Sequence, residues 1–144
     1  MPRHRDPLVS FDVPRDWESR TIIAYRAPRD GDAPAPNVVV TRDRLRDDED
    51  LVGYAERQLE ALEAEIDGFA LRGSGEVVVD GHPAIAIAFT SEGDGAPLAQ
   101  RMTMVALPDR LVATFTMTAP SRDLGQLAPL FERILASARF GEAP

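Results

Sequence analysis

The sequence contains no cysteine and no lysine, and it has two histidines among its 144 residues. Without cysteine the chain can form no disulfide, no thiolate metal site and no thiol nucleophile. The two histidines, His4 and His82, are isolated, and their spacing matches neither a zinc site nor an HExxH motif. All 16 basic residues are arginine, and we draw no functional conclusion from this. These absences exclude thiol chemistry and predict no metal site.

Excess positive charge and long apolar runs are also lacking. The formal net charge of −8 argues against nucleic acid or an anionic membrane as the main partner, because both require a concentrated positive field. The longest strongly apolar run, Pro83–Phe89, is far shorter than the ~20 residues that span a bilayer. Met1–Val9 carries two arginines but no apolar segment of a secretory signal. We therefore expect a soluble, cytoplasmic protein with no direct membrane anchoring.

Catalytic signatures are missing as well. A catalytic carboxylate pair needs one member in an apolar pocket, but the runs Pro83–Phe89 and Leu111–Thr118 contain no carboxylate. The glycine pairs in Gly73–Gly75 and Gly93–Gly95 do not stand between a strand and a helix, so they predict hairpins rather than a phosphate site. The sequence predicts no catalytic residue, no cofactor and no enzyme.

What the sequence does contain is a series of short β-type runs. Four of them lie close together, separated by turn residues such as Asp80-Gly81, which supply the positive φ angles of a two-residue hairpin. The spacing leaves no room for crossover helices, so these strands must pair antiparallel. The four runs are Glu76–Val79, Pro83–Phe89, Leu98–Leu107 and Leu111–Thr118, and three earlier ones are Leu8–Val13, Arg20–Ala27 and Asn37–Arg42.

Two segments have helical periodicity. Acidic residues crowd the start of Leu51–Ile66, where a helix has unpaired N–H groups, and Gly68 follows as a left-handed terminator. The second helix is predicted over Leu127–Phe140, with Pro129 in its first turn. We predict one α+β domain over residues 1–144, with a curved antiparallel sheet of about six or seven strands and two main helices packed on one face.

Such an arrangement would leave the other face of the sheet bare. That face would carry small, threonine and methionine side chains, and a large exposed patch of this type implies a partner or an oligomer. A solvated face without a role is the alternative. Trp17 is expected to cover one end of the core. Gln58, beside the apolar stripe of the first helix, is either a boundary residue in water or an amide that hydrogen-bonds a partner.

Short motifs follow one another along the chain in a recognisable order. They are Pro14-x-x-Trp17, Ile22–Ala27, Val38–Asp43, Tyr54-x-x-Arg57-Gln58-Leu59, Gly68-Phe69, Asp80–Ala84 and a threonine-rich strand running into Pro120. In this order the sequence resembles the DcrB-like family of small bacterial proteins, whose fold is related to PsbP, and it is particularly similar to the Eag chaperones of type VI secretion systems. The resemblance covers nearly the whole chain.

The resemblance implies a non-catalytic, cytoplasmic homodimer. It would hold the N-terminal apolar (transmembrane) helices of a secreted effector, beside its PAAR domain, until loading. Two departures from the family pattern are Met102, where an amide is expected, and Ala24, where a larger aliphatic side chain is expected. Rival interpretations are a small apolar-ligand or lipid carrier using the same face, and a PsbP-like assembly subunit that binds a folded partner. The partner-binding positions implied by the family are Ile22, Ala24, Val39, Gln58, Ile66, Leu98 and Met102.

Overall fold

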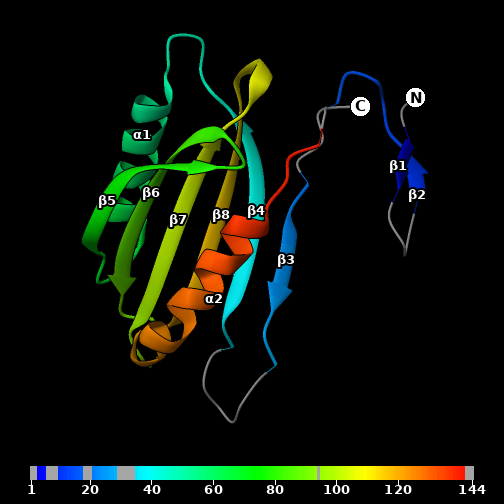
Figure 1. Ribbon diagram of the computed structural model, residues 1–144. Helices are drawn as coiled ribbons and strands as arrows, with labels where there is room; N and C mark the ends of the chain where they lie inside the picture. The colour runs from blue at the N-terminus through cyan, green and yellow to red at the C-terminus, as the bar shows by residue number, and fades with distance from the viewer. Residues whose placement is uncertain (1–2, 6–9, 18–20, 29–34, 94, 142–144) are drawn as a thin grey trace.

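The structure is a computed structural model that describes residues 3–5, 10–17, 21–28, 35–93 and 95–141 (Figure 1). Its strands β3 to β8 form one antiparallel sheet in the order β3-β4-β8-β7-β6-β5, and β1 and β2 form a separate hairpin. The antiparallel sheet and the two main helices are as predicted. The strands are β1 Arg3–Arg5, β2 Ser10–Asp12, β3 Ile23–Arg26, β4 Asn37–Arg44, β5 Ala70–Val79, β6 His82–Ser91, β7 Leu98–Ala106 and β8 Leu111–Pro120. The helices are α1 Leu51–Glu65 and α2 Leu124–Ser137.

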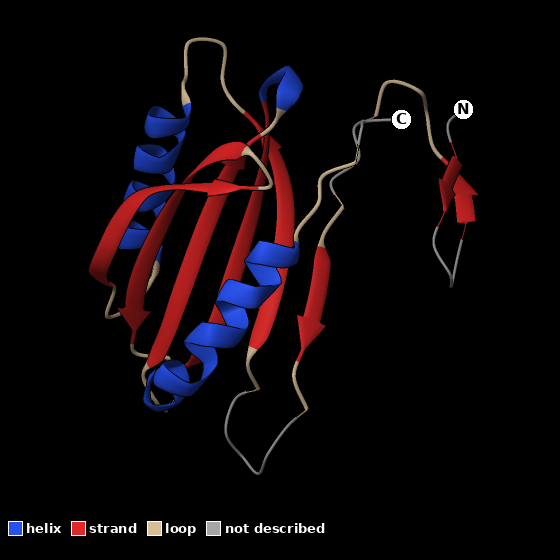
Figure 2. Cartoon of the chain, viewed as in Figure 1, coloured by secondary structure: helices blue, strands red, loops and turns tan. Residues whose placement is uncertain are grey.

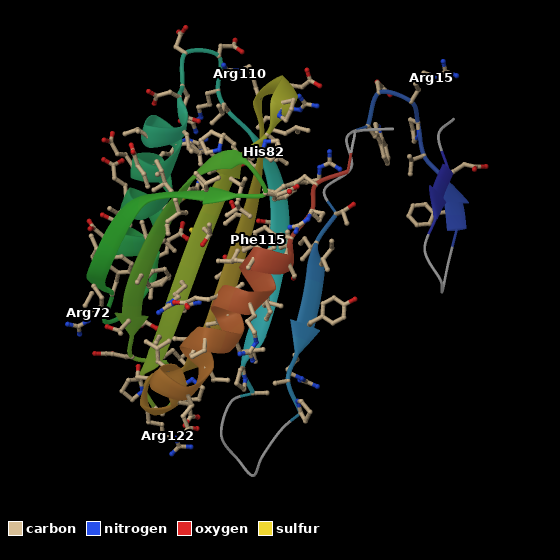
Figure 3. The ribbon with its side chains drawn as sticks, in the orientation of Figure 1. Arg15, Arg72, His82, Arg110, Phe115 and Arg122 are labelled. Carbon is tan, nitrogen blue, oxygen red and sulfur yellow. The ribbon has the colours of Figure 1, made fainter. Side chains whose placement is uncertain are left out.

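The two helices lie on opposite faces of the sheet. In β8, Val112 packs in a core cluster with Tyr54 and Ala55 of α1, whereas Phe115 and Met117 pack in a second cluster with α2. Alternate residues of a strand point to opposite faces, so the two clusters occupy the two faces. Figure 2 shows α2 crossing one face, and Figure 3 shows Phe115 beneath it.

The prediction of both helices on one face was therefore wrong. The central strands carry apolar side chains in both directions, so each face needs its own cover. In β7, for example, Met104 packs toward α1 and Val105 toward α2, and both are fully buried. The bulky row of β6, which includes Ile87 and Phe89, faces α1, and the small residue Ala84 faces the α2 side.

Local signals explain most element boundaries. The Asp50 carboxylate caps α1 by accepting a hydrogen bond from the Gly53 N–H at 2.8 Å. Gly68 has a φ of 70°, and a Cβ at this position would overlap the Glu92 side chain. The hairpin at Asp80-Gly81 has φ values of 48° and 76°, as its sequence predicts.

Other predictions are corrected by the structure. α2 begins at Leu124, after a 3₁₀ turn at Ser121–Asp123, so Pro129 lies inside the helix and not in its first turn. Trp17 is 68% exposed and does not cover the core. The predicted strand Leu8–Val13 is observed as Ser10–Asp12, with residues 8 and 9 outside the described part, and it pairs with the unpredicted strand β1.

Candidate functional site

Strand register brings several predicted binding residues into one row. Val39 of β4 pairs with Ala24 of β3 on one side and with Thr116 of β8 on the other, and Thr116 pairs with Met102 of β7. Directly paired residues in antiparallel strands share a face. Because Met102 packs against the cluster under α1, the whole row lies on the face that α1 occupies.

α1 covers this face incompletely. Its cluster reaches the sheet over β6, β7 and the beginning of β8, where Phe89, Met104 and Val112 are buried. Val39 of β4 and Leu98 at the beginning of β7 pack against neither core cluster of the described residues. We call the uncovered part of this face the open strip. It comprises Ala24, Val39, Thr116, Thr118, Leu98 and Gln100.

The open strip combines three apolar side chains, Ala24, Val39 and Leu98, with two threonines and one glutamine. Val39, Leu98 and Thr116 are half-buried, and Ala24 is exposed on the edge strand. The Gln100 side-chain amide donates a hydrogen bond to the Thr118 hydroxyl at 3.0 Å, which links β7 to β8. A surface of this kind can accept an apolar partner while offering hydrogen-bonding groups to its polar atoms.

The remaining predicted residues flank the strip. Ile66, the residue that caps the C-terminal end of α1, and Met102 both pack against the α1 cluster and so also support the core. Ile22 directly precedes β3 and is exposed. The structure therefore gathers the predicted set on and around one face, with Ile66 and Met102 at its covered side.

Gln58 lies on the side of α1 that faces β4. One helical turn earlier, the Tyr54 hydroxyl donates to the Asp43 carboxylate of β4 at 3.2 Å. Residues i and i+4 share one side of a helix, so Gln58 follows Tyr54 along that side. Gln58 is half-buried, and its amide has no hydrogen bond to another side chain in the described part of the chain. It is available to a partner on the open strip.

An ion pair and a cation–π contact order the beginning of α1. The Arg57 guanidinium donates two hydrogen bonds to the Glu49 carboxylate, each of 2.9 Å, and lies 5.1 Å from the Tyr54 ring centroid. These hydrogen bonds lower the pKa of Glu49 to about 2. Burial, followed by the charge of Asp43, raises the pKa of Tyr54 to about 12. The network therefore orients the side of α1 that borders the open strip.

Neither metal chemistry nor a membrane helix is evident in the described residues. They contain no group of three or more histidine, aspartate or glutamate side chains placed to hold a metal ion. None of the helices formed by the described residues is long and apolar enough to cross a membrane.

The chain belongs to the DcrB family, which it matches over residues 9–137. Within that class it is 25% identical over 135 residues to a Pseudomonas aeruginosa protein named Effector EagT6, a match that covers 94% of this chain and 93% of that protein. The resemblance to the DcrB-like family found in the sequence is thus confirmed.

Two solved structures share the fold. The crystal structure of PA94, a Pseudomonas aeruginosa protein of unknown function, has a TM-score of 0.81 and 23% identity, covering 99% of both chains. The solution structure of cyanobacterial PsbP from Synechocystis sp. PCC 6803 has a TM-score of 0.54 and 14% identity, covering 94% of this chain and 89% of that one. The predicted relationship to the PsbP fold is therefore confirmed.

Sequence reasoning left three strip residues out of the binding set, namely Gln100, Thr116 and Thr118. The signal for the two threonines is their alternation with apolar residues in β8, which indicates a strand face that is neither fully buried nor fully polar. The register with β4 and β7 was needed to show that they lie beside Val39.

The Glu49–Arg57 ion pair at the beginning of α1 predicts a specific pH dependence of the stability. Glu49→Gln should lower the urea midpoint of unfolding at pH 7, because it removes a carboxylate that is 11% exposed and doubly hydrogen-bonded to Arg57. The folded pKa of Glu49, about 2, lies below its ordinary value of 4.5. The stabilisation is thus fully present above about pH 4.5 and is lost as the pH falls toward 2. The difference in midpoint between wild type and variant should shrink over this interval.

The matched control is Glu56→Gln, which makes the same change at an exposed position of α1. Its midpoint should follow that of the wild type at every pH. A difference between the Glu49 variant and the wild type that stays constant from pH 7 to pH 2 would contradict this account of the network.

Proposed function

We propose that this protein is a non-catalytic, cytoplasmic chaperone that binds N-terminal apolar helices of a type VI secretion effector, next to a PAAR domain, on the open strip. The observation that carries the proposal is the open strip on the α1 face, in which the apolar residues Val39 and Leu98 lie outside both core clusters. Membership of the DcrB family and similarity to Effector EagT6 support a chaperone role.

The chemistry of the strip suits an apolar helix. A transmembrane segment held in water exposes apolar area at a cost of roughly 25 cal/mol per Å², and a carrier must bury that area reversibly. Val39, Leu98 and the flanking Ile22 supply apolar contact. The free amide of Gln58 and the threonine hydroxyls of β8 can satisfy polar atoms of the helix, as side chains do between helices in a membrane. These contacts need no catalytic group.

We further propose that two copies associate through the edge strand β3. This strand has β4 as its sheet neighbour, and all four of its residues are exposed. Ile23 and Tyr25 point to the face opposite Ala24, so apolar surface continues around this edge on both faces. An exposed edge strand offers unpaired backbone N–H and C=O groups, and apolar side chains beside them favour pairing with another strand. A dimer formed here would extend the open strip of one copy toward that of the other.

Val39→Gln should abolish co-purification with the cognate effector. The substitution places an amide in the centre of the row, where an apolar helix gives it no hydrogen-bond partner. Burying an unpaired amide costs about 1–3 kcal/mol, so we expect the affinity to fall about tenfold or more. The measurement is a pull-down of tagged effector, with circular dichroism to verify the fold.

Val78→Gln is the matched control. Val78 is 72% exposed and lies on β5, at the other edge of the sheet. Both residues lie on the α1 face, so retention of the effector by the Val78 variant and its loss from the Val39 variant would support the assignment to the open strip. Equal retention by both variants would contradict it.

The dimer predicts a solution mass of two 15.7 kDa chains by light scattering. Tyr25→Glu should reduce the mass to one chain, because a carboxylate is introduced into the proposed edge contact and would face its symmetry copy. Val78→Glu introduces a carboxylate at a side chain with the same 72% exposure on the opposite edge of the sheet. It should leave the mass unchanged. A monomeric wild type would refute the proposed edge pairing.

A further inference from the structure

A groove of about 680 Å³ lies on the α2 face of the sheet. One wall is β5 with its turn to β6, the other is α2, and the floor is formed by β6 and β7. Figure 1 shows β5 curving across this side of the sheet. The volume is in the range of small-molecule sites. The groove is on the opposite face from the open strip and has no part in the proposed chaperone contacts.

The residues at the bottom of the groove have small side chains or none. Gly73 and Gly75 of β5 stand opposite Ala88 and Ala86 of β6 in the strand register. No atom lies within 4 Å of the position that a Cβ would take on either glycine. The missing side-chain volume therefore opens a channel above the backbone of β5 and β6.

Two polar side chains of β7 enter this apolar channel. Thr103 is 2% exposed, and its hydroxyl has no hydrogen bond to another side chain among the described residues. Two residues earlier and on the same face, Arg101 has an ion-pair contact of 3.8 Å with Glu132, whose side chain is 72% exposed on α2. Both Arg101 and Thr103 thus keep hydrogen-bonding capacity directed to the groove.

Arg101 lines the groove together with two carboxylates, Asp80 and Glu132, and neither binds it through two hydrogen bonds. Asp80 at the turn is already engaged, because it accepts the Phe140 N–H at 2.9 Å and lies 3.9 Å from the Arg139 guanidinium. Glu132 is a long, mostly solvated side chain that a stronger ligand can displace. A guanidinium binds a carboxylate through two parallel hydrogen bonds, and this geometry exceeds a single 3.8 Å contact in strength.

We propose that this groove binds a single-chain aliphatic carboxylate. The carboxylate accepts hydrogen bonds from the Arg101 guanidinium and the Thr103 hydroxyl. The alkyl chain lies over the glycine and alanine floor and contacts Val77 and Val79. The apolar side chains account for affinity that rises with chain length, and Arg101 accounts for the selection of an anionic head group.

The test is calorimetric titration of the full chain with hexanoate, octanoate and decanoate below their micelle-forming concentrations. Each added methylene should tighten binding about fourfold until the groove is filled. Decylammonium, with the same chain length and opposite charge, should bind far more weakly. Amide NMR shifts should change at Gly73 and Gly75 and remain unchanged at Val39.

Two variants separate the head-group site from the chain site. Arg101→Gln should weaken every carboxylate about tenfold or more, through loss of the charged hydrogen bonds. Ala88→Leu fills the floor and should weaken decanoate more than hexanoate. Val39→Gln should bind all three as the wild type does, so loss of effector binding and loss of ligand binding remain distinguishable.

Several results would overturn the proposal. These are the absence of heat and of shift changes at millimolar decanoate, equal binding of decylammonium, and shift changes located on the open strip. Wild-type affinity in both the Arg101 and the Ala88 variants, with the fold verified by circular dichroism, would also refute it.

Discussion

Both faces of the sheet carry apolar side chains that must be shielded from water, and the described chain supplies one long helix for each face. This constraint follows from the central strands, in which neighbouring residues such as Met104 and Val105 are both fully buried and point in opposite directions. A single helix is about 10–12 Å wide and cannot cover six strands spaced nearly 5 Å apart. Each face is consequently covered in part, and each keeps an accessible region.

The two accessible regions differ in chemistry because they lie over different strands. The open strip reaches toward the edge strand β3 and is built from valine, leucine and threonine, with Gln58 of α1 at its border. The groove lies beside β5, where glycine and alanine replace larger side chains and Arg101 supplies a charge. One fold thus offers an extended surface suited to a helix and a narrow channel suited to a small amphiphile. The Tyr54 hydroxyl, which donates to Asp43 of β4, holds α1 to the sheet at the border of the first region.

Much of the fold follows from local signals, whereas the site depends on long-range pairing. Asp50, Gly68 and the Asp80-Gly81 turn mark element boundaries through interactions within a few residues, and these were predictable. The placement of α1 and α2 on opposite faces was missed, although apolar residues at successive positions of β7 carry the signal. Trp17 was misassigned because burial of an aromatic side chain depends on contacts that local sequence does not specify. The family resemblance indicated Ala24 and Val39, but the register that sets them beside Thr116 could not be read from spacing alone.

The central claim is that the open strip receives the apolar segment of the partner. Hydrogen–deuterium exchange, measured on this chain alone and in complex with its proposed effector partner, tests that claim most directly. The account predicts slower exchange in β3 and β4, and in the part of α1 around Gln58, with β5 and α2 unchanged. Slower exchange confined to β5 and α2, with β3 and β4 exchanging as in the free chain, would contradict it.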